Sequence, residues 1–513
     1  MERQSRVRKS LLNMRANMVS YFLAIFIAFF SRKIFLDKLG AEFIGLTTTA
    51  NSLLGFLNLA ELGVGTSIAY FLYKPIFEND REKINDTISI MGYMYRIIGL
   101  VILVAGIILS LFLPLIFEKT DFSWGIIYYC FYAQLVCSLI GYFVNYKANT
   151  IFAADQRQYL VTGYFQVSQF LMAITQMCLA YFTSSFTLFI TVTLVFSVLN
   201  SLVLNWKFNQ IYPWVTSSFK RGRIALKSRP EIVRYIRRVF IHQIGGFVNY
   251  RVMPIIMYSF ASLTTVALYG NYITILDKVG GAMSSVFGGT GASVGNLIAE
   301  GNRKKIFDCY KELFSVKFSL VAFLFVCSLK FCNSFITVWL GEEYLLSQVL
   351  VILICANSCL DLFRDTTEQF LNGFGLKADV WVPMCRIGSL VFVVGAGYYW
   401  GLTGMLLIPV AVQIILMHVW KPYYLFHEGF GLPFYEYLKV LLACIIPFVV
   451  AGITAEFMVT YIMGNMIVTT WNMLFYQIAL FIIPLALVSI ILLGYFNAGF
   501  RMFVTRILNL IRK

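Results

Sequence analysis

The chain has 513 residues, of which 59% are hydrophobic and 13% are charged, and its mean hydropathy is +0.77. A soluble protein of this length could not bury so much apolar surface, so the composition excludes that class and predicts an all-α integral membrane protein. The ten cysteines form no CxxC pair and the three histidines show no metal-ligand spacing. The sequence therefore predicts neither a metal site nor a cofactor.

Apolar runs between charged or turn-forming breaks predict about fourteen membrane-spanning helices. In chain order they cover residues 15–36, 43–73, 87–113, 125–148, 159–182, 187–207, 240–260, 266–298, 313–338, 347–372, 380–400, 403–424, 437–461 and 473–496. An even number places both termini on one side, and most of the 41 Lys and Arg residues fall on that side. Both termini are therefore predicted to be cytoplasmic. The net charge of +16 belongs to loops beside anionic lipid, so no nucleic-acid partner is expected.

The spans predict four regions of the chain. They are an N-lobe of six helices, a basic cytoplasmic linker, a C-lobe of six helices, and two peripheral helices with a basic tail, at residues 1–207, 208–239, 240–424 and 425–513. Residues 206–240 hold nine basic side chains and a single acidic one, Glu231. Pro213, Gly222 and Pro230 interrupt helices in this stretch. Together with the basic charge, they favour a linker that lies on the cytoplasmic lipid headgroups.

An internal repeat relates the two predicted lobes. The loop "ENDREKI" (78–84) aligns with "EGNRKKI" (300–306), and each follows a helix with a glycine-rich break, "ELGVGTSIAY" and "FGGTGASVGN". Two six-helix lobes in the same orientation predict a pseudo-twofold axis along the membrane normal, an architecture of secondary transporters. When the same alignment is continued towards the N-terminus and shortened slightly in an outer loop, it pairs Arg32 with Arg251.

The stretches "RKIFLDKLGAEFIGL", "LNLAELGVGTSIAYFLYKPI" and "NDREKI" resemble the N-terminal signature of Wzx-type polysaccharide flippases. These belong to the multidrug, oligosaccharidyl-lipid and polysaccharide exporter superfamily. The resemblance implies that the chain flips undecaprenyl-pyrophosphate-linked oligosaccharide repeat units across the bacterial inner membrane, for O-antigen, capsule or exopolysaccharide synthesis. It also implies alternating access around a cation-lined cavity between the lobes, and a polysaccharide polymerase and chain-length proteins as partners.

Basic residues inside the predicted helices are the first candidates for a site. They are Arg96, Arg251, Lys278, Lys317, Lys330, Arg364 and Arg386. Arginine stays charged in proteins and matches phosphate oxygens with a planar fork. We therefore predict that Arg251, with Arg32, Lys278 and Arg364 in support, attracts the pyrophosphate or anionic sugars.

For each of these basic residues a structural alternative stands beside the functional one. Lys278 could pair with a neighbouring helix, and Arg251 could hold the lobes together. Snorkelling accounts equally well for the four candidates near an interface, which are Arg96, Lys317, Lys330 and Arg386.

Acidic residues form the second group. In "CLDLFRDTTEQF" the side chains of Asp361, Arg364, Asp365 and Glu368 share one helical face. Arg364 could neutralise an acid one turn away. Alternatively one of these acids, or Glu61 or Asp277, binds H⁺ or Na⁺ and couples transport to an ion gradient. Glu61 has a structural alternative of its own, since it could cap the broken helix beside it.

Two rival functions follow from the same residues. A membrane glycosyltransferase or ligase would need an outer catalytic surface, and the predicted periplasmic loops are too short for one. We therefore expect no enzyme. A cation-coupled multidrug antiporter or a lipid II flippase of the same superfamily is the closer alternative.

Overall fold

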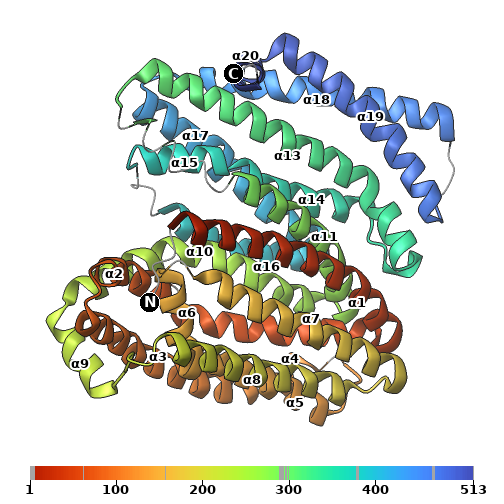
Figure 1. Ribbon diagram of the computed structural model, residues 1–513. Coiled ribbons are helices and arrows are strands. Elements are labelled where there is room, and N and C mark those ends of the chain that lie inside the picture. The colour runs from red at the N-terminus through yellow and green to blue at the C-terminus, as the bar shows by residue number, and fades with distance from the viewer. Residues whose placement is uncertain are drawn as a thin grey trace. The chain divides into compact units, whose positions relative to one another are not determined.

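A computed structural model describes residues 6–511 apart from 62, 119, 156, 288–293, 295, 296, 299, 377–380 and 465–467. The described residues are helical with no β-strand (Figure 1), and the chain is an all-α, multi-pass integral membrane protein with about fourteen spans. Its contacts divide it into two compact units, Met1–Ala267 and Leu268–Lys513. The division falls inside α11 (Leu263–Phe287), beyond the basic linker at which the sequence predicted the change of lobe.

The first unit contains the helices of the first repeat and α10. They are α1 (Arg6–Leu57), η1 (Asn58–Glu61), α2 (Val64–Glu78), α3 (Arg81–Ser110), α4 (Leu113–Ile116), α5 (Trp124–Ile140), η2 (Gly141–Asn145), α6 (Tyr146–Ala154), α7 (Gln158–Thr183), α8 (Phe186–Ile211), α9 (Phe219–Ser228) and α10 (Pro230–Phe260). Helix α1 contains the first predicted span and part of the second, joined at Gly40, whose φ of 83° favours glycine.

The second unit contains the rest of α11 and the C-terminal helices. They are α13 (Arg303–Trp339), η3 (Glu342–Tyr344), α14 (Gln348–Phe363), α15 (Asp365–Gly373), α16 (Trp381–Gln413), η4 (Ile414–Trp420), α17 (Lys421–Tyr424), η5 (Leu425–Phe430), α18 (Phe434–Met463), α19 (Trp471–Phe496) and α20 (Ala498–Ile511). The predicted spans 380–400 and 403–424 meet at Gly401, where φ is 57°.

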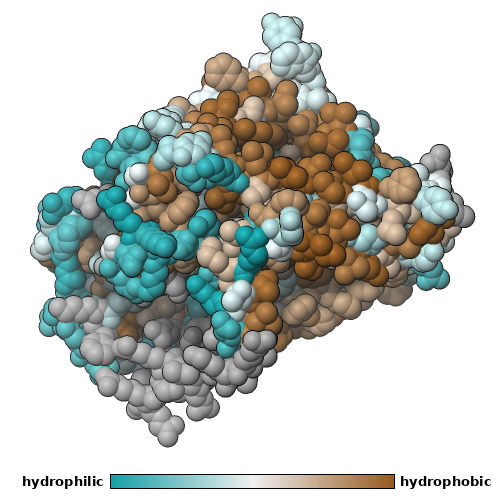
Figure 2. Space-filling model, turned by 90° about the horizontal axis from the view of Figure 1, so that it is seen from above, coloured by the Kyte–Doolittle hydropathy of each residue, from teal (hydrophilic) through white to brown (hydrophobic). Residues whose placement is uncertain are grey.

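Seven described helical stretches are long and apolar enough to cross a membrane. They are Arg81–Ser110, Trp124–Ala154, Phe186–Ile211, Arg303–Trp339, Trp381–Phe430, Phe434–Met463 and Trp471–Phe496. Large apolar side chains stay exposed on these helices, as at Val391 (74% exposed) and Ile491 (67%). Figure 2 shows one face with a broad hydrophobic area and hydrophilic residues gathered towards one end. Such a surface needs lipid as its solvent.

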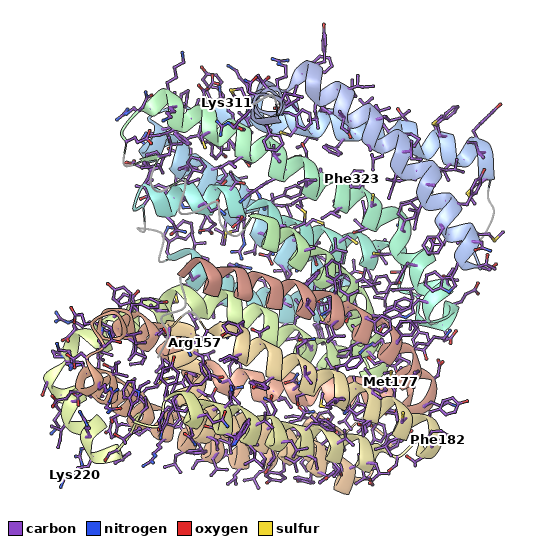
Figure 3. All side chains as sticks on the ribbon, in the orientation of Figure 1. Arg157, Met177, Phe182, Lys220, Lys311 and Phe323 are labelled. Atoms are coloured by element: carbon purple, nitrogen blue, oxygen red, sulfur yellow. The ribbon has the colours of Figure 1, made fainter. Side chains whose placement is uncertain are left out.

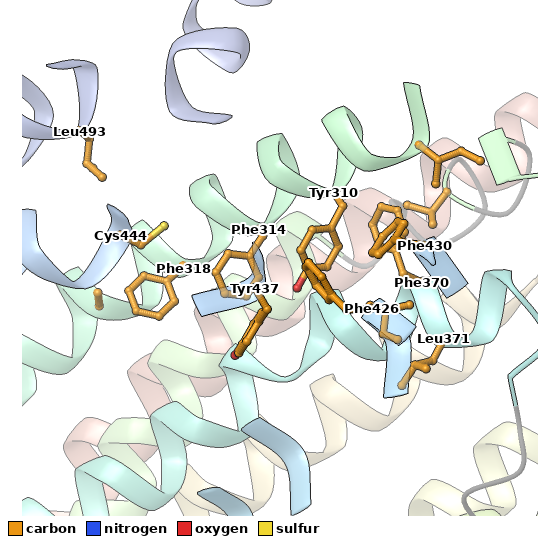
Figure 4. Packing of buried hydrophobic residues seen from close by; sticks show 14 of the residues in the cluster. Tyr310, Phe314, Phe318, Phe370, Leu371, Phe426, Phe430, Tyr437, Cys444 and Leu493 are labelled. Atoms are coloured by element: carbon orange, nitrogen blue, oxygen red, sulfur yellow. The ribbon is translucent and has the colours of Figure 1, made fainter. Parts of the chain in front are cut away.

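Aromatic rings form the core of the second unit beside the N-terminal half of α13 (Figure 4). Tyr310 packs edge-on against Phe370 of α15, with ring centroids 5.1 Å apart, and against Phe426 of η5 at 5.4 Å. Each of these three side chains is fully buried. This cluster fixes α13, α15 and η5 against one another and so positions the nearby charged residues of α13 and α15.

The predicted basic linker is folded. Residues 219–228 form α9, which packs on α3, and α10 begins at Pro230, well before the predicted span. Arg221 Nε lies 2.6 Å from Asp86 Oδ1, and a Cβ added to Gly222 would lie 2.0 Å from the carbonyl oxygen of Ser89. Ion pairs and close glycine packing therefore hold this segment on the protein.

The internal repeat is visible in the backbone before α3 and before α13. Asn79 and Gly301, which the repeat aligns with each other, both have positive φ, at 54° and 77°. In the next position, Asp80 Oδ1 accepts from Lys83 N at 3.0 Å and Asn302 Oδ1 from Lys305 N at 3.1 Å, so both helices begin with the same N-cap. Most of "FGGTGASVGN", at 287–296, lies outside the described residues.

The two caps should respond differently to acid. Hydrogen bonds from Lys83 hold the pKa of Asp80 below its usual range. The stabilisation that this carboxylate gives as a cap is therefore complete above the pKa of Asp80 in the unfolded chain. It is lost as the pH falls through the pKa of Asp80 in the folded protein. Asn302 does not titrate. Hydrogen exchange measured at decreasing pH should therefore show a loss of protection at residues 81–84 and none at 303–306, after correction for intrinsic rates. Asp80→Asn should abolish the difference, and an equal loss at both helices would contradict the assignment.

Candidate functional site

A cluster of charged side chains lies within the second unit, where α14 ends and α15 begins. Lys317 Nζ of α13 lies 2.6 Å from Asp365 Oδ2, and Lys421 of α17 forms an ion pair with Glu368. Asp361 Oδ1 lies 3.1 Å from Arg364 Nε and 3.8 Å from Arg386 Nη2 of α16. The predicted acids of "CLDLFRDTTEQF" are thus brought together with cations from three other helices.

Three of the four cations are the buried members of this cluster. Lys317, Arg386 and Lys421 are only 5%, 7% and 7% exposed, whereas the side chains of Asp361 and Asp365 are 42% and 50% exposed. Snorkelling was one of two alternatives for Lys317 and Arg386, and in the structure both side chains lie beside carboxylates inside the unit. Among the described residues, the ion pairs of this cluster join four cations to three carboxylates.

Arg386 has the weakest local compensation of these cations. Its contact with Asp361 is longer than a hydrogen bond, and Asp361 Oδ1 is shared with Arg364. Its Nε is buried without a hydrogen-bond partner among the described residues. A guanidinium has five N–H donors and cannot neutralise by deprotonation, so Arg386 can accept an additional anionic ligand.

A second polar cluster lies in the first unit, beside the break after α1. The Glu61 carboxylate at the end of η1 accepts from Tyr95 OH and from the backbone N–H of Gly65. One turn earlier, Asn58 Oδ1 accepts from Ser138 Oγ at 2.9 Å and from Tyr142 OH at 3.1 Å. Glu61 therefore caps the start of α2, as its structural alternative required, and also joins a buried hydroxyl cluster that could exchange a proton.

The glycine at position 65 leaves room for this contact. A Cβ at Gly65 would lie 2.9 Å from Tyr95 OH and 3.2 Å from Glu61 Oε1. Gly65→Ala should therefore separate the two side chains and destabilise the protein by about 1–3 kcal/mol, measured by thermal unfolding in detergent. Gly163→Ala is the matched control, because no atom lies within 4 Å of a Cβ there. Equal stability of the two variants would show that the Glu61 contact is dispensable.

The remaining predicted residues lie elsewhere. Arg32 is half-buried in α1, and its Nη2 donates to the carbonyl oxygen of Ala267 in α11 at 3.0 Å. Asp277 and Lys278 lie on α11, the acid exposed and the lysine half-buried. Arg251 falls within α10, and its side chain lies outside the described residues. The proposed pairing of Arg32 with Arg251 stays a prediction.

One member of the charge cluster, Lys421, was missed from the sequence, and so was the contact of the nearby His418. Lys421 lies near the end of the predicted span 403–424. In the structure the helix continues through η5, and Lys421 is 7% exposed within the aromatic-rich stretch "HVWKPYYLFH". His418 Nε2 lies 3.0 Å from the carbonyl oxygen of Leu360. One lysine within an aromatic run was the signal that could have identified this position.

Comparisons with known proteins identify solved structures that share the fold of this chain. No family model and no curated protein sequence matches the chain. The lipid II flippase MurJ in an inward closed conformation is similar with a TM-score of 0.61 and 14% identity, over 94% of this chain and 98% of that one. An inward-facing multidrug resistance MATE transporter of the MOP superfamily has a TM-score of 0.56 and 16% identity, over 78% and 93%. The chain therefore has the fold of MATE and MurJ transporters.

Proposed function

We propose that this protein flips undecaprenyl-pyrophosphate-linked oligosaccharide repeat units from the cytoplasmic to the periplasmic leaflet of a bacterial inner membrane, as a non-enzymatic step in surface polysaccharide synthesis. Alternating access moves the headgroup, and the lipid tail stays in the membrane. A polymerase and chain-length proteins would act on the product. The fold supports a transporter, and its match to the MurJ flippase extends over 94% of the chain. The sequence motifs favour the polysaccharide branch.

The under-compensated guanidinium of Arg386 is the observation that carries this proposal. A pyrophosphate headgroup has to leave water, and a fixed, pre-oriented cation lowers the cost of that transfer. In the second unit, Arg364 lies next to Arg386 on the same carboxylate, so two planar forks are available to phosphate oxygens. Lys278, Arg32 and Arg251 remain proposed contributors to substrate attraction.

Deletion in a host that makes surface polysaccharide tests the proposal. Undecaprenyl-linked repeat units should accumulate on the cytoplasmic side, and sensitivity to cationic drugs should not change. Lipid-linked intermediates are measured by extraction and mass spectrometry, and a plasmid copy of the wild-type chain should restore export. Normal export with increased drug sensitivity would reject the flippase and favour the multidrug antiporter.

The antiporter is a second candidate because the open partners in the charge cluster are carboxylates. Asp361 and Asp365 expose 42% and 50% of their side chains, which suits a cationic drug or a coupling ion better than an anion. Three other acids are proposed coupling positions: Glu368 in the same cluster, Glu61 in the first unit, and Asp277 on α11. Transport measured in proteoliposomes under imposed pH and Na⁺ gradients tests coupling for either substrate, and indifference to both gradients would reject it.

A further inference from the structure

Two surface helices dock at matching positions of the internal repeat. Helix α9 packs on α3 and α20 packs on α13. A Cβ at Gly222 would lie 2.0 Å from the carbonyl oxygen of Ser89, and one at Gly499 would lie 2.3 Å from that of Lys311. Ser89 and Lys311 occupy equivalent positions when the alignment of 78–84 with 300–306 is continued along the two helices. Figure 3 shows Lys220 at the outer end of the first unit and Lys311 beside α20.

Both helices are basic and amphipathic. α9 carries four basic residues and α20 carries two, and neither contains an acid. Each also exposes apolar side chains next to the charges, including Ile224 (59% exposed) on α9 and Leu508 (49%) on α20. Helix α20 begins directly after the last membrane helix, and α9 follows α8 by a short turn. Basic helices with an exposed apolar side at the ends of membrane spans lie in the lipid headgroup layer.

A groove runs beside each helix. The groove between α3 and α9 has a volume of about 530 Å³ and includes Asp86, Lys220, Arg221 and Arg229. The groove between α13 and α20 has a volume of about 1040 Å³, and its charged residues are Lys304, Lys305, Asp308, Glu312, Arg501 and Arg506. Asp86 and Asp308 are again aligned by the repeat. The two grooves therefore lie beside equivalent positions of α3 and α13.

The carboxylates in the grooves are already neutralised. Arg221 lies 2.6 Å from Asp86, Lys311 lies 2.7 Å from Asp308, and Arg506 lies 2.8 Å from Glu312. Lys220 and Lys304 are exposed at the two grooves, and no carboxylate of the described residues forms an ion pair with either. Each groove thus presents a cation that no carboxylate of the described residues neutralises.

We propose that each groove binds the phosphate headgroup of an anionic phospholipid. Lys220 meets the phosphate in the first unit and Lys304 meets it in the second, while Ile224 and Leu508 contact the acyl chain region. The sites are independent of the transported substrate. They anchor equivalent points of the two units to anionic lipid on the side that the sequence predicts to be cytoplasmic.

Native mass spectrometry of the full-length protein, released from nanodiscs containing phosphatidylglycerol and phosphatidylcholine, tests the sites. Wild type should retain two phosphatidylglycerol molecules. Lys220→Gln and Lys304→Gln should each lose one, with about a five-fold weaker apparent affinity at the affected site. Lys227→Gln on α9 and Arg303→Gln at the start of α13 are matched controls, because they remove the same charge from residues outside the grooves.

Three results would overturn the proposal. Equal losses in the control variants would mean that general surface charge, and no defined groove, attracts the lipid. Equal retention of phosphatidylcholine would remove the requirement for an anionic headgroup. Competition by millimolar sn-glycerol phosphate would identify a site for soluble phosphates. Melting temperatures of all four variants should stay within about 2 °C of wild type, so that loss of lipid reports the site and not unfolding.

Discussion

Replacing Arg386 by methionine is expected to reduce flipping at least ten-fold while leaving the free energy of unfolding unchanged or higher. The lost activity follows from removal of a charged hydrogen-bond donor to the phosphate, worth about 1.5–3 kcal/mol. Stability is preserved because Arg386 is 7% exposed with incomplete compensation, and an apolar side chain of similar length avoids its desolvation cost. Asp361 keeps its contact with Arg364 at 3.1 Å. Flipping is measured with a labelled lipid-linked oligosaccharide in proteoliposomes, and stability by denaturant unfolding in detergent.

Two comparison variants make this result specific. Asp361→Asn should destabilise the protein by about 3 kcal/mol, because it removes the carboxylate that Arg364 and Arg386 share. Lys83→Met should change neither quantity appreciably, since Lys83 lies in the first turn of α3, ahead of the predicted span 87–113, and is 55% exposed. If Arg386→Met unfolds like Asp361→Asn, Arg386 has a structural role. Wild-type flipping in Arg386→Met would remove it from the substrate site.

Apolar run length and glycine positions were sufficient to predict much of the fold. The break near 40 and the repeat at 78–84 and 300–306 both appear in the backbone, the first as the turn at Gly40 and the second as matching N-caps on α3 and α13. These features are local, since they depend on a few consecutive residues. The docking of α9 and the extent of α10 depend on long-range contacts with α3 and α1, which a single sequence does not display.

The charge cluster was only partly predictable for the same reason. Spacing alone placed Asp361, Arg364 and Glu368 on one side of a helix. It could not identify which cations from α13, α16 and α17 would meet them, because snorkelling and burial give the same sequence pattern near a helix end. The π-helical turns η4 and η5 on either side of α17 also depart from the α-helical period, so the direction of Lys421 could not be derived from it.

The docking of α9 and α20 should depend on single glycines. Gly222→Ala and Gly499→Ala would each place a methyl group within 2.3 Å of a backbone carbonyl oxygen, which cannot move without displacing α3 or α13. Each variant is expected to lose about 1–3 kcal/mol of stability and to release only its own surface helix. Limited trypsin digestion should then cut within 219–228 in the first variant and within 498–511 in the second.

Gly388→Ala in α16 is the control, since no atom lies within 4 Å of a Cβ at that position. It should leave digestion unchanged and raise stability slightly, because alanine favours helix. If Gly222→Ala and Gly499→Ala resist trypsin as wild type does, the ion pairs Arg221–Asp86 and Arg506–Glu312 hold the helices without the close backbone contact. Release of both helices by either substitution would show that the two docking sites are coupled through the rest of the chain.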